Sequence, residues 1–301
     1  MSEGLNTRTT LNNGVRMPRL GLGVWKTDNS TAKNSVKNAI EHGYRLIDTA
    51  KQYGNEYGVG QGIKEAIQET GLNRKNLFIT TKLYNGDQGY LSTLHAVKGT
   101  LKRLGLSYID LYIMHWPVDG KYLDTWHAME KLYHEGLVRA IGISNFSVAR
   151  MKNLLAHSTV TPAVNQIEFN PINQEMKIIP FNNQMGIQTE AWSPLGGGEA
   201  LGNKTINKIA KKHGKSAAQV ILRWDWDRGI VTIPKSAHEK RIIQNSQIFD
   251  FQLNADEIKA INGVDQGKRS IWYDNFTWHS KNAPYTDQID HWDDSPKDWK
   301  E

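Results

Sequence analysis

Eight short apolar segments, rich in β-branched residues, alternate with longer amphipathic segments along most of this chain. Their length and composition predict buried strands at residues 19–25, 44–50, 77–83, 109–116, 138–144, 164–169, 187–192 and 230–236. The amphipathic segments predict helices, the clearest of which are at 30–42, 62–70, 91–104 and 217–228, with one further helix at 253–263. Asp, Asn or Ser often precede these segments and Gly often follows them, which is typical of helix caps.

This alternation predicts an α/β fold with a parallel sheet, because strands that read as continuous apolar runs are buried on both faces. Eight successive strand-helix units favour a closed (β/α)8 TIM barrel, and a doubly wound open sheet remains the alternative. A length of 301 residues allows two domains or one large barrel, and we expect a single domain over residues 1–301.

Two segments lie outside the repeating pattern. The sequence TTLNNGVRMP at residues 9–18 places an Asn-Gly pair between short extended runs, which predicts a β-hairpin that closes the bottom of the barrel. Residues 264–301 contain several tryptophans without clear periodicity, and we expect an extended C-terminal loop or tail there.

The composition narrows the chemistry. The chain contains no cysteine, which excludes disulfides, thiol nucleophiles and thiolate metal sites. It contains no HExxH motif, and His115 has no partner at metal-ligand spacing, so we expect no metal site. No apolar run approaches the roughly 20 residues needed to span a bilayer, and the polar first residues contain no signal-peptide core, so we expect a cytoplasmic protein without a membrane partner.

The net charge of +6 is concentrated in one segment. Residues 204–241 contain ten basic and three acidic residues, and the lysines have helical spacing. A nucleic-acid interface would instead need a broad basic surface with interleaved aromatic residues. We therefore expect a solvated helix face, no nucleic-acid partner, and a monomer or weak dimer.

Polar, ionisable or tryptophan side chains stand at the C-terminal end of every predicted strand. Active sites of (β/α)8 barrels are built at this end. One such residue alone is more often a helix cap or a structural group, but convergence at one barrel mouth changes this interpretation, because buried charges persist only when they are paired. The residues are Trp25, Asp48, Lys82, His115, Ser144 with Asn145, Gln166, Trp192, and Lys235 with Ser236.

Three of these side chains, together with Tyr53 in the loop after the second strand, suit acid catalysis. Asp48 and Lys82 come from adjacent strands and can neutralise each other, and Tyr53 follows Asp48 closely enough to reach the same point. A nearby ammonium lowers the pKa of a phenol from its reference value of about 10. His115 can donate a second hydrogen bond to the same reacting oxygen. The set suits protonation of a carbonyl oxygen.

Other residues suit a nicotinamide cofactor. Asn145 and Gln166 can hold a carboxamide, and Trp192 offers a flat face to an aromatic ring. The segment PKSAHEKR, with Lys235, Ser236 and Arg241 near the start of a helix, suits a phosphate monoester such as the 2′-phosphate of NADP. We expect Trp25 and Trp116, with His115, to wall a compact substrate pocket.

Up to about residue 265 the sequence closely resembles the aldo-keto reductase family, in particular its prokaryotic 2,5-diketo-D-gluconate reductase-like branch. The segments that carry the resemblance are GYRLIDTAKQYGNE (43–56), LFITTKL (77–83), IDLYIMHWP (109–117), GISNF (142–146), NQIE (165–168) and IPKS (233–236). The resemblance implies that Tyr53 is the general acid, that Lys82 and Asp48 tune it, and that His115 orients the carbonyl.

The same resemblance implies an NADPH site. Ser144, Asn145 and Gln166 would bind the carboxamide and Trp192 would stack on the nicotinamide. The remaining expected cofactor-binding residues are Ser193, Leu195, Lys235, Ser236, Arg241, Gln244 and Asn245. Trp192 replaces a Tyr found in many members, and His238 stands where related sequences often have Arg, which leaves some use of NADH open. In the family, the segment corresponding to residues 264–301 helps to set substrate specificity.

We therefore expect an NADPH-dependent reductase of small aldehydes, α-dicarbonyls or keto sugars. One alternative is a Schiff-base aldolase with Lys82 as nucleophile, which Asp48 disfavours because the lysine would have to be unpaired. A second alternative is a protein that binds NADPH without turnover. A pure binding protein has no need for a tuned acid, so the set of Asp48, Tyr53, Lys82 and His115 argues against it.

Overall fold

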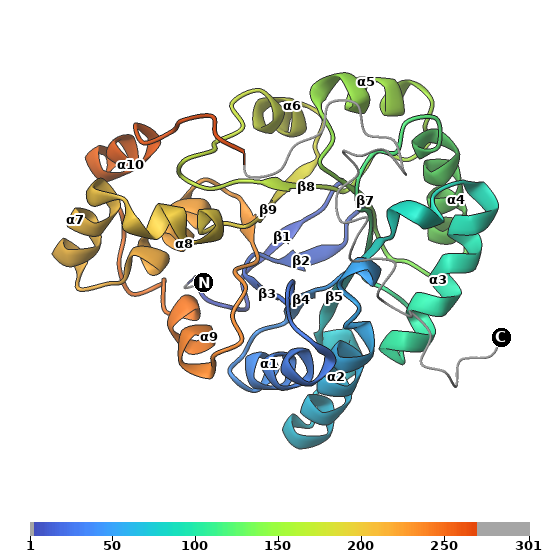
Figure 1. Cartoon of the computed structure of the whole chain (residues 1–301), viewed down its shortest axis with the longest axis horizontal. Coiled ribbons are helices and arrows are strands. Elements are labelled where there is room, and N and C mark those ends of the chain that lie inside the picture. The colour runs from blue at the N-terminus through green and yellow to red at the C-terminus, as the bar shows by residue number, and fades with distance from the viewer. Residues whose placement is uncertain (1–2, 270–301) are drawn as a thin grey trace.

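A computed structural model describes residues 3–269 and shows a parallel barrel surrounded by helices (Figure 1). Within these residues the sheet has eight strands, in the order β10-β9-β8-β7-β6-β5-β4-β3, and neighbouring strands are parallel. The strands are β3 Gly21–Gly23, β4 Leu46–Asp48, β5 Phe78–Leu83, β6 Leu111–Met114, β7 Ile141–Ser144, β8 Val164–Glu168, β9 Gln188–Trp192 and β10 Val231–Thr232.

Two backbone bridges close the barrel. Leu20 pairs with Thr232 and Gly23 pairs with Lys235, so the first and last strands of the sheet meet. Each strand lies within one of the eight segments predicted from the sequence, and their buried side chains explain the continuous apolar runs. The predicted TIM barrel is confirmed, and the alternative of an open, doubly wound sheet is wrong.

The α-helices surround the barrel (Figure 1). Of the five helices with predicted bounds, four begin and end within two residues of the prediction, whereas α2 begins six residues before the predicted start at residue 62. They are α1 Asn29–Glu41, α2 Glu56–Thr70, α3 Tyr90–Leu104, α4 Tyr122–His134, α5 Val148–Ala156, α6 Ile178–Gln184, α7 Lys204–His213, α8 Ala217–Asp227, α9 Glu239–Ser246 and α10 Ala255–Asn262. Short 3₁₀ helices occupy loops at η1 Lys51–Tyr53, η2 Arg74–Asn76, η3 Asn85–Asp87 and η4 Gly196–Gly202. Capping boxes at Ser216 and Asn254 start α8 and α10 where the sequence predicts helix starts.

The predicted hairpin is present and covers the N-terminal end of the barrel. Strands β1 Arg8–Thr10 and β2 Arg16–Pro18 pair antiparallel. Leu11 and Met17 are buried in one cluster with Leu46, Phe78 and Leu111, which lie at the starts of three barrel strands. The hairpin therefore fills this end of the barrel with apolar side chains and leaves the opposite end for a site.

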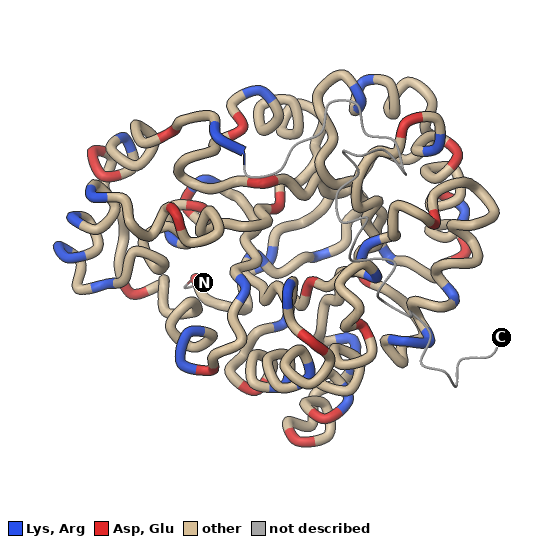
Figure 2. Tube along the Cα trace, in the orientation of Figure 1, with Lys and Arg blue, Asp and Glu red and all other residues tan. Residues whose placement is uncertain are grey.

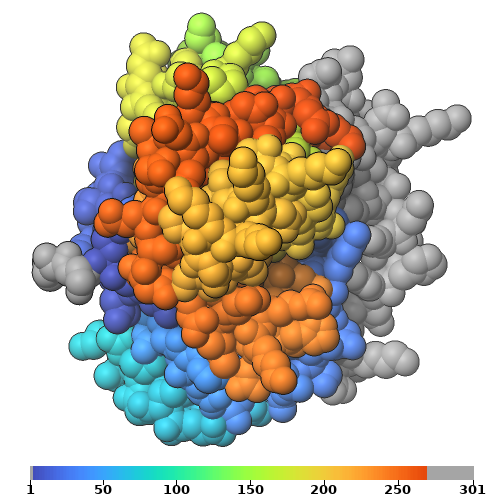
Figure 3. Space-filling view, turned by 90° about the vertical axis from the view of Figure 1, so that its left-hand side faces the viewer, coloured from blue at the N-terminus to red at the C-terminus, as the bar shows by residue number. Residues whose placement is uncertain are grey.

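The basic segment at residues 204–241 contains the partly exposed helix α7, the largely buried helix α8 and the buried strand β10. Figure 3 shows the gold segment of α7 beside the orange α9 and the red α10. The lysines of α7, which are marked in blue along the tube in Figure 2, are exposed: Lys204, Lys208, Lys211 and Lys212. Lys212 binds Glu257 of α10 at 2.6 Å, and Lys215 binds Asp250 at 2.6 Å, so part of this charge is neutralised by acidic residues further along the chain.

The described start of the C-terminal segment contacts the loop after β8 and the 3₁₀ helix η4. The backbone N–H groups of Gln266 and Lys268 donate to the carbonyl of Ile172, and Lys268 Nζ lies 2.8 Å from Glu199 of η4. The rest of the tail predicted at 264–301, from residue 270 onward, lies outside the described residues. Among residues 3–269, no helix combines the length and apolarity needed to cross a membrane.

Candidate active site

A cavity of about 480 Å³ opens at the C-terminal ends of the barrel strands. Its wall combines aromatic rings with polar side chains from most of the strands. The residues named from the sequence that line it are Trp25, Asp48, Tyr53, His115, Trp116, Ser144, Asn145, Gln166, Trp192, Ser193, Leu195, Lys235, Ser236 and Arg241. The structure thus brings together, at one end of the barrel, side chains that span more than 200 positions of the sequence.

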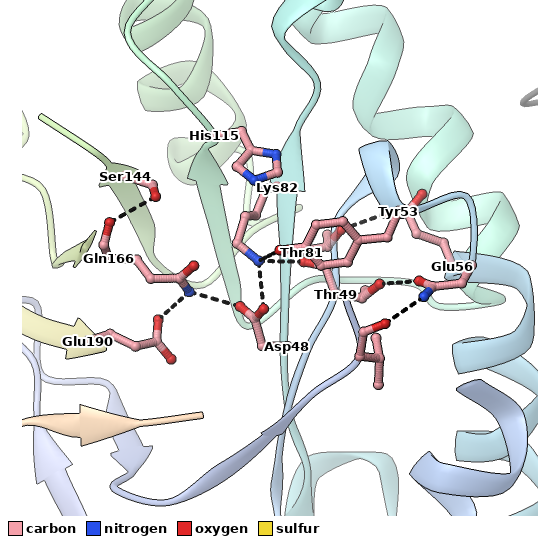
Figure 4. Close-up of polar contacts among 12 residues, drawn as sticks. Asp48, Thr49, Tyr53, Glu56, Thr81, Lys82, His115, Ser144, Gln166 and Glu190 are labelled. Carbon is pink, nitrogen blue, oxygen red and sulfur yellow. Dashed lines mark hydrogen bonds and ion pairs between the residues drawn. The ribbon is translucent and has the colours of Figure 1, made fainter. Parts of the chain in front are cut away.

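Lys82 lies at the centre of the polar cluster (Figure 4). Its Nζ donates to Asp48 Oδ1 at 2.6 Å and to the carbonyl of Thr49 at 2.9 Å. The third contact of Nζ is with the hydroxyl of Tyr53, at 3.2 Å. Asp48 and Lys82 are both buried. The predicted cluster of acid, lysine and phenol is therefore assembled around a single ammonium group.

The segment that carries Tyr53 is fixed by the two residues that follow it. Tyr53 ends η1, and Gly54 follows with a φ of 64°, a left-handed conformation that glycine adopts without strain. Asn55 then donates to the carbonyl of Val24 at 2.9 Å and accepts from the hydroxyl of Thr49 at 2.8 Å. These contacts fix the start of α2 and restrict the position of the phenol.

Glu56 adds a buried anchor to the same segment. Its carboxylate accepts from Thr81 Oγ1 at 2.5 Å and from Arg103 Nε at 2.7 Å. Glu56 is the first residue of α2, Thr81 precedes Lys82 on β5, and Arg103 belongs to α3. The loop of Tyr53 is thereby tied to the strand of Lys82.

Burial controls the protonation states of this cluster. Burial raises the pKa of Tyr53 above its ordinary value, although Lys82 acts in the opposite direction. The expectation that Lys82 lowers the pKa of this phenol is therefore correct for the lysine alone and wrong for the net shift. Tyr53 is protonated at neutral pH, which is the state that an acid needs.

The pKa values of Lys82 and Asp48 also depend on burial and on the opposite charge that each group faces. Burial alone would lower the pKa of Lys82, but the charge of Asp48, together with the hydrogen bonds to Asp48 and Tyr53, raises it above its ordinary value. Burial raises the pKa of Asp48, and Lys82 opposes this shift. A lysine held as ammonium is a poor nucleophile, which argues against the Schiff-base alternative.

His115 is present as a neutral imidazole. Burial, with a smaller contribution from the charge of Lys82, lowers the pKa of His115 well below its ordinary value. Its Nδ1 is buried without a hydrogen-bond partner among the described residues, and its ring lies edge-on to Tyr53 with the ring centres 5.8 Å apart. An N–H at Nδ1 would be left unsatisfied, so the tautomer with the proton on Nε2 is favoured.

Gln166 presents one free acceptor to the cavity. Its Nε2 donates both to Asp48 Oδ2 at 2.9 Å and to Glu190 Oε2 at 2.8 Å (Figure 4). Since two acceptors fix the amide nitrogen, Oε1 remains to accept a hydrogen bond from a ligand. This orientation fits the NH₂ group of a carboxamide.

Ser144 and Asn145 are already hydrogen-bonded within the protein. Ser144 Oγ donates to the carbonyl of Gln166 at 2.8 Å. Asn145 Nδ2 donates to the carbonyl of His115 at 3.1 Å and to Ser144 Oγ at 2.9 Å, and its Oδ1 accepts from Trp192 Nε1 at 2.9 Å. These two residues lie where the sequence predicts, and in this structure they form a frame behind Gln166.

Backbone strain is concentrated at the cavity. Within residues 3–269, four non-glycine residues have positive φ, and three of them, Lys26 (56°), Asn145 (62°) and Ser193 (50°), line the cavity. Such conformations cost free energy and are often found at ligand sites. The surrounding hydrogen bonds, such as that from the N–H of Gly197 to Ser193 Oγ at 3.0 Å, hold one of these residues in place.

One end of the cavity carries positive charge. Lys235 and Arg241 line it, together with Ser236 and the ring of His238. Ser236 Oγ accepts from the N–H of His238 at 3.1 Å, which forms the turn that leads into α9. Gln244 and Asn245 lie further along α9 and do not contribute to the cavity wall.

Several residues of this site were not found from the sequence. Glu190 lies in the middle of a predicted strand. An acidic residue inside an otherwise apolar strand is unusual, and this feature of the sequence could have marked Glu190 as a candidate site residue. Lys26, Gly197, Gly198 and Leu201 also line the cavity. Among residues 3–269, the His, Asp and Glu side chains form no group of three or more that could hold a metal ion.

Sequence comparison places close relatives beside this chain. The family model described as "Aldo/keto reductase family" matches residues 19–266. Glyoxal reductase of Bacillus subtilis (strain 168) is 50% identical over 270 residues, which are 89% of this chain and 96% of the relative. Methylglyoxal reductase DkgA of Escherichia coli (strain K12) is 44% identical over 263 residues, which are 86% of this chain and 94% of the relative.

Structural comparison agrees with the sequence. The crystal structure of a Bombyx mori aldo-keto reductase in complex with NADP superposes with a TM-score of 0.83 at 37% sequence identity, and the match covers 87% of this chain and 94% of that one. The family model matches all eight strands of the barrel. The sequence identities of 50% and 44% extend over most of both chains, which is enough to establish family membership. The chain described here therefore belongs to the aldo/keto reductase family.

Proposed function

We propose that this protein uses NADPH to reduce small carbonyl compounds, in particular small aldehydes, α-dicarbonyls or keto sugars, to alcohols. The observation that carries this proposal is the contact of one buried ammonium, Lys82 Nζ, with both Asp48 and the hydroxyl of Tyr53 at the floor of the cavity. An acid that is protonated at neutral pH and lies beside a fixed cation is what reduction of a carbonyl requires.

The residues present fit the cofactor. Gln166 Oε1 is oriented to accept from the carboxamide, and the Trp192 indole offers a face to the ring. Lys235 and Arg241 supply two positive charges for the 2′-phosphate at the other end. When bound, NADPH supplies the hydride that reaches the carbonyl carbon. The relative crystallised with NADP and the family membership support this choice.

The side chains of this chain then divide the remaining work. Tyr53 donates its proton to the carbonyl oxygen, and Lys82 stabilises the tyrosinate that is left, since an ammonium favours the anionic phenol. The neutral His115 donates a hydrogen bond from Nε2 to the same oxygen and thereby orients the substrate. Asp48 keeps Lys82 charged and in place.

The choice of substrates rests on the pocket and on the relatives. Trp25 and Trp116 supply apolar walls near Tyr53 and His115, which favour a compact substrate with an apolar side. The names glyoxal reductase and methylglyoxal reductase support α-dicarbonyls.

We propose in addition that residues 1–301 form one domain and that 264–301 contribute to substrate specificity, since Lys268 binds η4 next to the cavity.

The variant Tyr53→Phe tests this mechanism. We expect it to lose at least about 100-fold in NADPH oxidation, followed at 340 nm with a nitrobenzaldehyde and with methylglyoxal, because general acid catalysis contributes about that much or more. Binding of NADPH, measured by calorimetry, should remain close to that of the wild type. Tyr57→Phe, at an exposed tyrosine of α2, is the matched control and should keep full activity. Unchanged turnover in Tyr53→Phe would overturn the proposed mechanism.

A further inference from the structure

Glu190 is a buried acid that the proposed mechanism does not use. It occupies the middle of β9, where it pairs in register with Gln166 of β8 and Val231 of β10. Its side chain has no solvent-exposed surface. Figure 4 shows it beside Gln166 and on the opposite side of that amide from Lys82. Glu190 therefore lies directly behind the proposed carboxamide site.

One amide nitrogen separates two carboxyl groups here. Gln166 Nε2 donates to Glu190 Oε2 at 2.8 Å and to Asp48 Oδ2 at 2.9 Å. Asp48 has a cation at 2.6 Å, the ammonium of Lys82. Glu190 Oε1, in contrast, is buried and has no hydrogen-bond partner among the described residues. The two acids thus compete for one amide, and only Asp48 has a direct counter-ion.

The charges of this cluster do not balance when both acids are ionised. The groups facing Glu190 are Asp48 of β4, Lys82 of β5 and Gln166 of β8, and beyond them lie the uncharged Tyr53 and His115. Two carboxylates and one ammonium would leave a net charge of −1 inside the barrel. Burial, reinforced by the charge of Asp48, raises the pKa of Glu190 to about 8. Glu190 therefore carries a proton at neutral pH.

We propose that Glu190 is the counter-charge for the oxidised nicotinamide ring: it is a neutral acid in the free protein and beside the reduced ring, and it releases its proton when the oxidised cofactor binds. This inference rests on the proposed function, because the reduced and oxidised rings differ by one positive charge. The balance is simple: protonated enzyme and NADP⁺ give the ionised enzyme complex and one proton in solution, and no electrons move. The ionised cluster and the cationic ring together have no net charge.

If Glu190 has this role, the relative affinity of the protein for NADPH and NADP⁺ depends on pH. Below a pH of about 8, NADP⁺ must displace a proton from Glu190, so its affinity falls as the pH falls. NADPH has an uncharged ring and displaces no proton. The ratio of the two dissociation constants should therefore change with pH, whereas each constant separately also contains the titration of the 2′-phosphate and of groups away from the nicotinamide ring. Both forms share those groups, which cancel in the ratio.

The experiment measures both dissociation constants on the full chain by calorimetry, from pH 6 to pH 9. We expect the preference for NADPH over NADP⁺ to weaken by about tenfold to a hundredfold from pH 6 to pH 9, the scale expected for two unit charges roughly 6–12 Å apart at an effective dielectric constant of about 20. At pH 7, calorimetry in two buffers of different ionisation enthalpy should show roughly half to one proton released per NADP⁺ and none per NADPH.

Glu190→Gln is the decisive variant. Its amide oxygen can still accept from Gln166 Nε2, but the side chain cannot ionise. We expect a ratio that is constant with pH, no proton release, and an unchanged affinity for NADPH. Asp225→Asn is the matched control, because Asp225 is a buried acid with a raised pKa, is bonded to Thr232, and lies outside the cavity wall. It should retain the pH dependence of the wild type.

The outcomes separate the two proposals. If the wild-type ratio is constant with pH and NADP⁺ releases no more protons than NADPH, the role of Glu190 is overturned and the proposed function stands. If neither cofactor binds, the proposed function itself fails. A wild-type proton count that is the same for NADP⁺ and NADPH needs no variant, so it overturns the role of Glu190 even if Glu190→Gln does not fold. A pH-dependent ratio that persists in Glu190→Gln overturns it as well.

Discussion

Trp192 Nε1 donates a 2.9 Å hydrogen bond to Asn145 Oδ1. This bond joins the end of β9 to the loop after β7, where Asn145 has a φ of 62°. The Nδ2 of Asn145 also donates to the carbonyl of His115 after β6. A tyrosine at position 192 would have no indole N–H for this bond. Trp192 is thus part of the frame that holds a strained residue of the cavity wall.

The first prediction uses Trp192→Phe, which removes this hydrogen bond but keeps an aromatic ring that can stack. The phenyl ring can still stack on a nicotinamide, but Asn145 Oδ1 loses its donor. We expect a loss of about 1 kcal/mol in the free energy of unfolding, the usual net value of a buried hydrogen bond, measured by urea denaturation. NADPH affinity should fall by about fivefold to tenfold, as expected when about 1 kcal/mol of preorganisation is lost. Equal affinities for wild type and variant would show that the bond does not organise the site.

The pair of Asp48 and Lys82 gives a second prediction. Asp48→Asn leaves the buried ammonium of Lys82 without its counter-ion, with Glu190 as the remaining acid on the far side of Gln166. Removing one partner of a buried ion pair costs about 3–5 kcal/mol, and with Glu190 nearby we expect about 3 kcal/mol in urea denaturation.

The double variant Asp48→Asn with Lys82→Met is the control for this prediction. It removes both charges, so it should recover more than half of the lost stability while remaining inactive. A double variant that is less stable than the single variant would mean that packing, and not the unpaired charge, explains the loss.

A third prediction concerns the positive end of the cavity. Arg241 lines it from α9, and we expect Arg241→Ala to weaken NADPH binding by about tenfold or more, the scale of one charge-assisted contact to a phosphate. NADH lacks the 2′-phosphate, so its binding should be unchanged. Lys208→Ala, on the exposed face of α7, should alter neither dissociation constant. If the preference for NADPH over NADH is the same in Arg241→Ala and wild type, Arg241 is a surface charge.

The contact between α7 and α10 gives a prediction about pH. Partial burial would raise the pKa of Glu257, but hydrogen bonds from Lys212, the backbone and His213 lower it to about 2. A carboxyl group with a lowered pKa stabilises the fold fully above its unfolded value of about 4.5, and this contribution is lost as the pH falls toward 2. Because Lys212 is largely exposed, we expect the contribution to be about 1 kcal/mol.

Glu257→Gln tests that contribution. The difference in urea denaturation between wild type and variant should be about 1 kcal/mol at pH 7 and should shrink steadily below a pH of about 4.5. Glu135→Gln, at an exposed ion pair with Lys131, is the control and should have little effect at either pH. A difference that does not change with pH would point to packing of Glu257 and not to its charge.

The sequence was sufficient for the fold because the strands are buried on both faces, which makes their apolar runs continuous and easy to recognise. It was sufficient to place Asp48, Lys82 and His115 near one another because the ends of parallel strands meet at one end of a barrel. Their catalytic roles stay predictions until the variants are measured.

Other features of the site depend on register and backbone conformation. Glu190 contacts the cluster because it lies across from Gln166 in the sheet, and no spacing along the chain indicates this. The positive φ of Lys26 and Ser193 has no signature in their residue types. The assignment of Gln244 and Asn245 rested on resemblance, and on α9 they lie outside the cavity wall. The pKa of Tyr53 is raised because of its burial, and the sequence does not show how far this side chain is buried.

The hairpin of β1 and β2 has a consequence for kinetics. Because Leu11 and Met17 fill the lower end and the cavity opens at the other, we expect water and protons to reach the interior of the described barrel through its mouth. The cofactor would occupy that same opening, so hydration and proton exchange of the interior compete with cofactor residence for one entrance. Rapid-mixing experiments on this protein should therefore begin from samples equilibrated at the final pH, since a pH jump after cofactor binding would be slow to reach the buried acids.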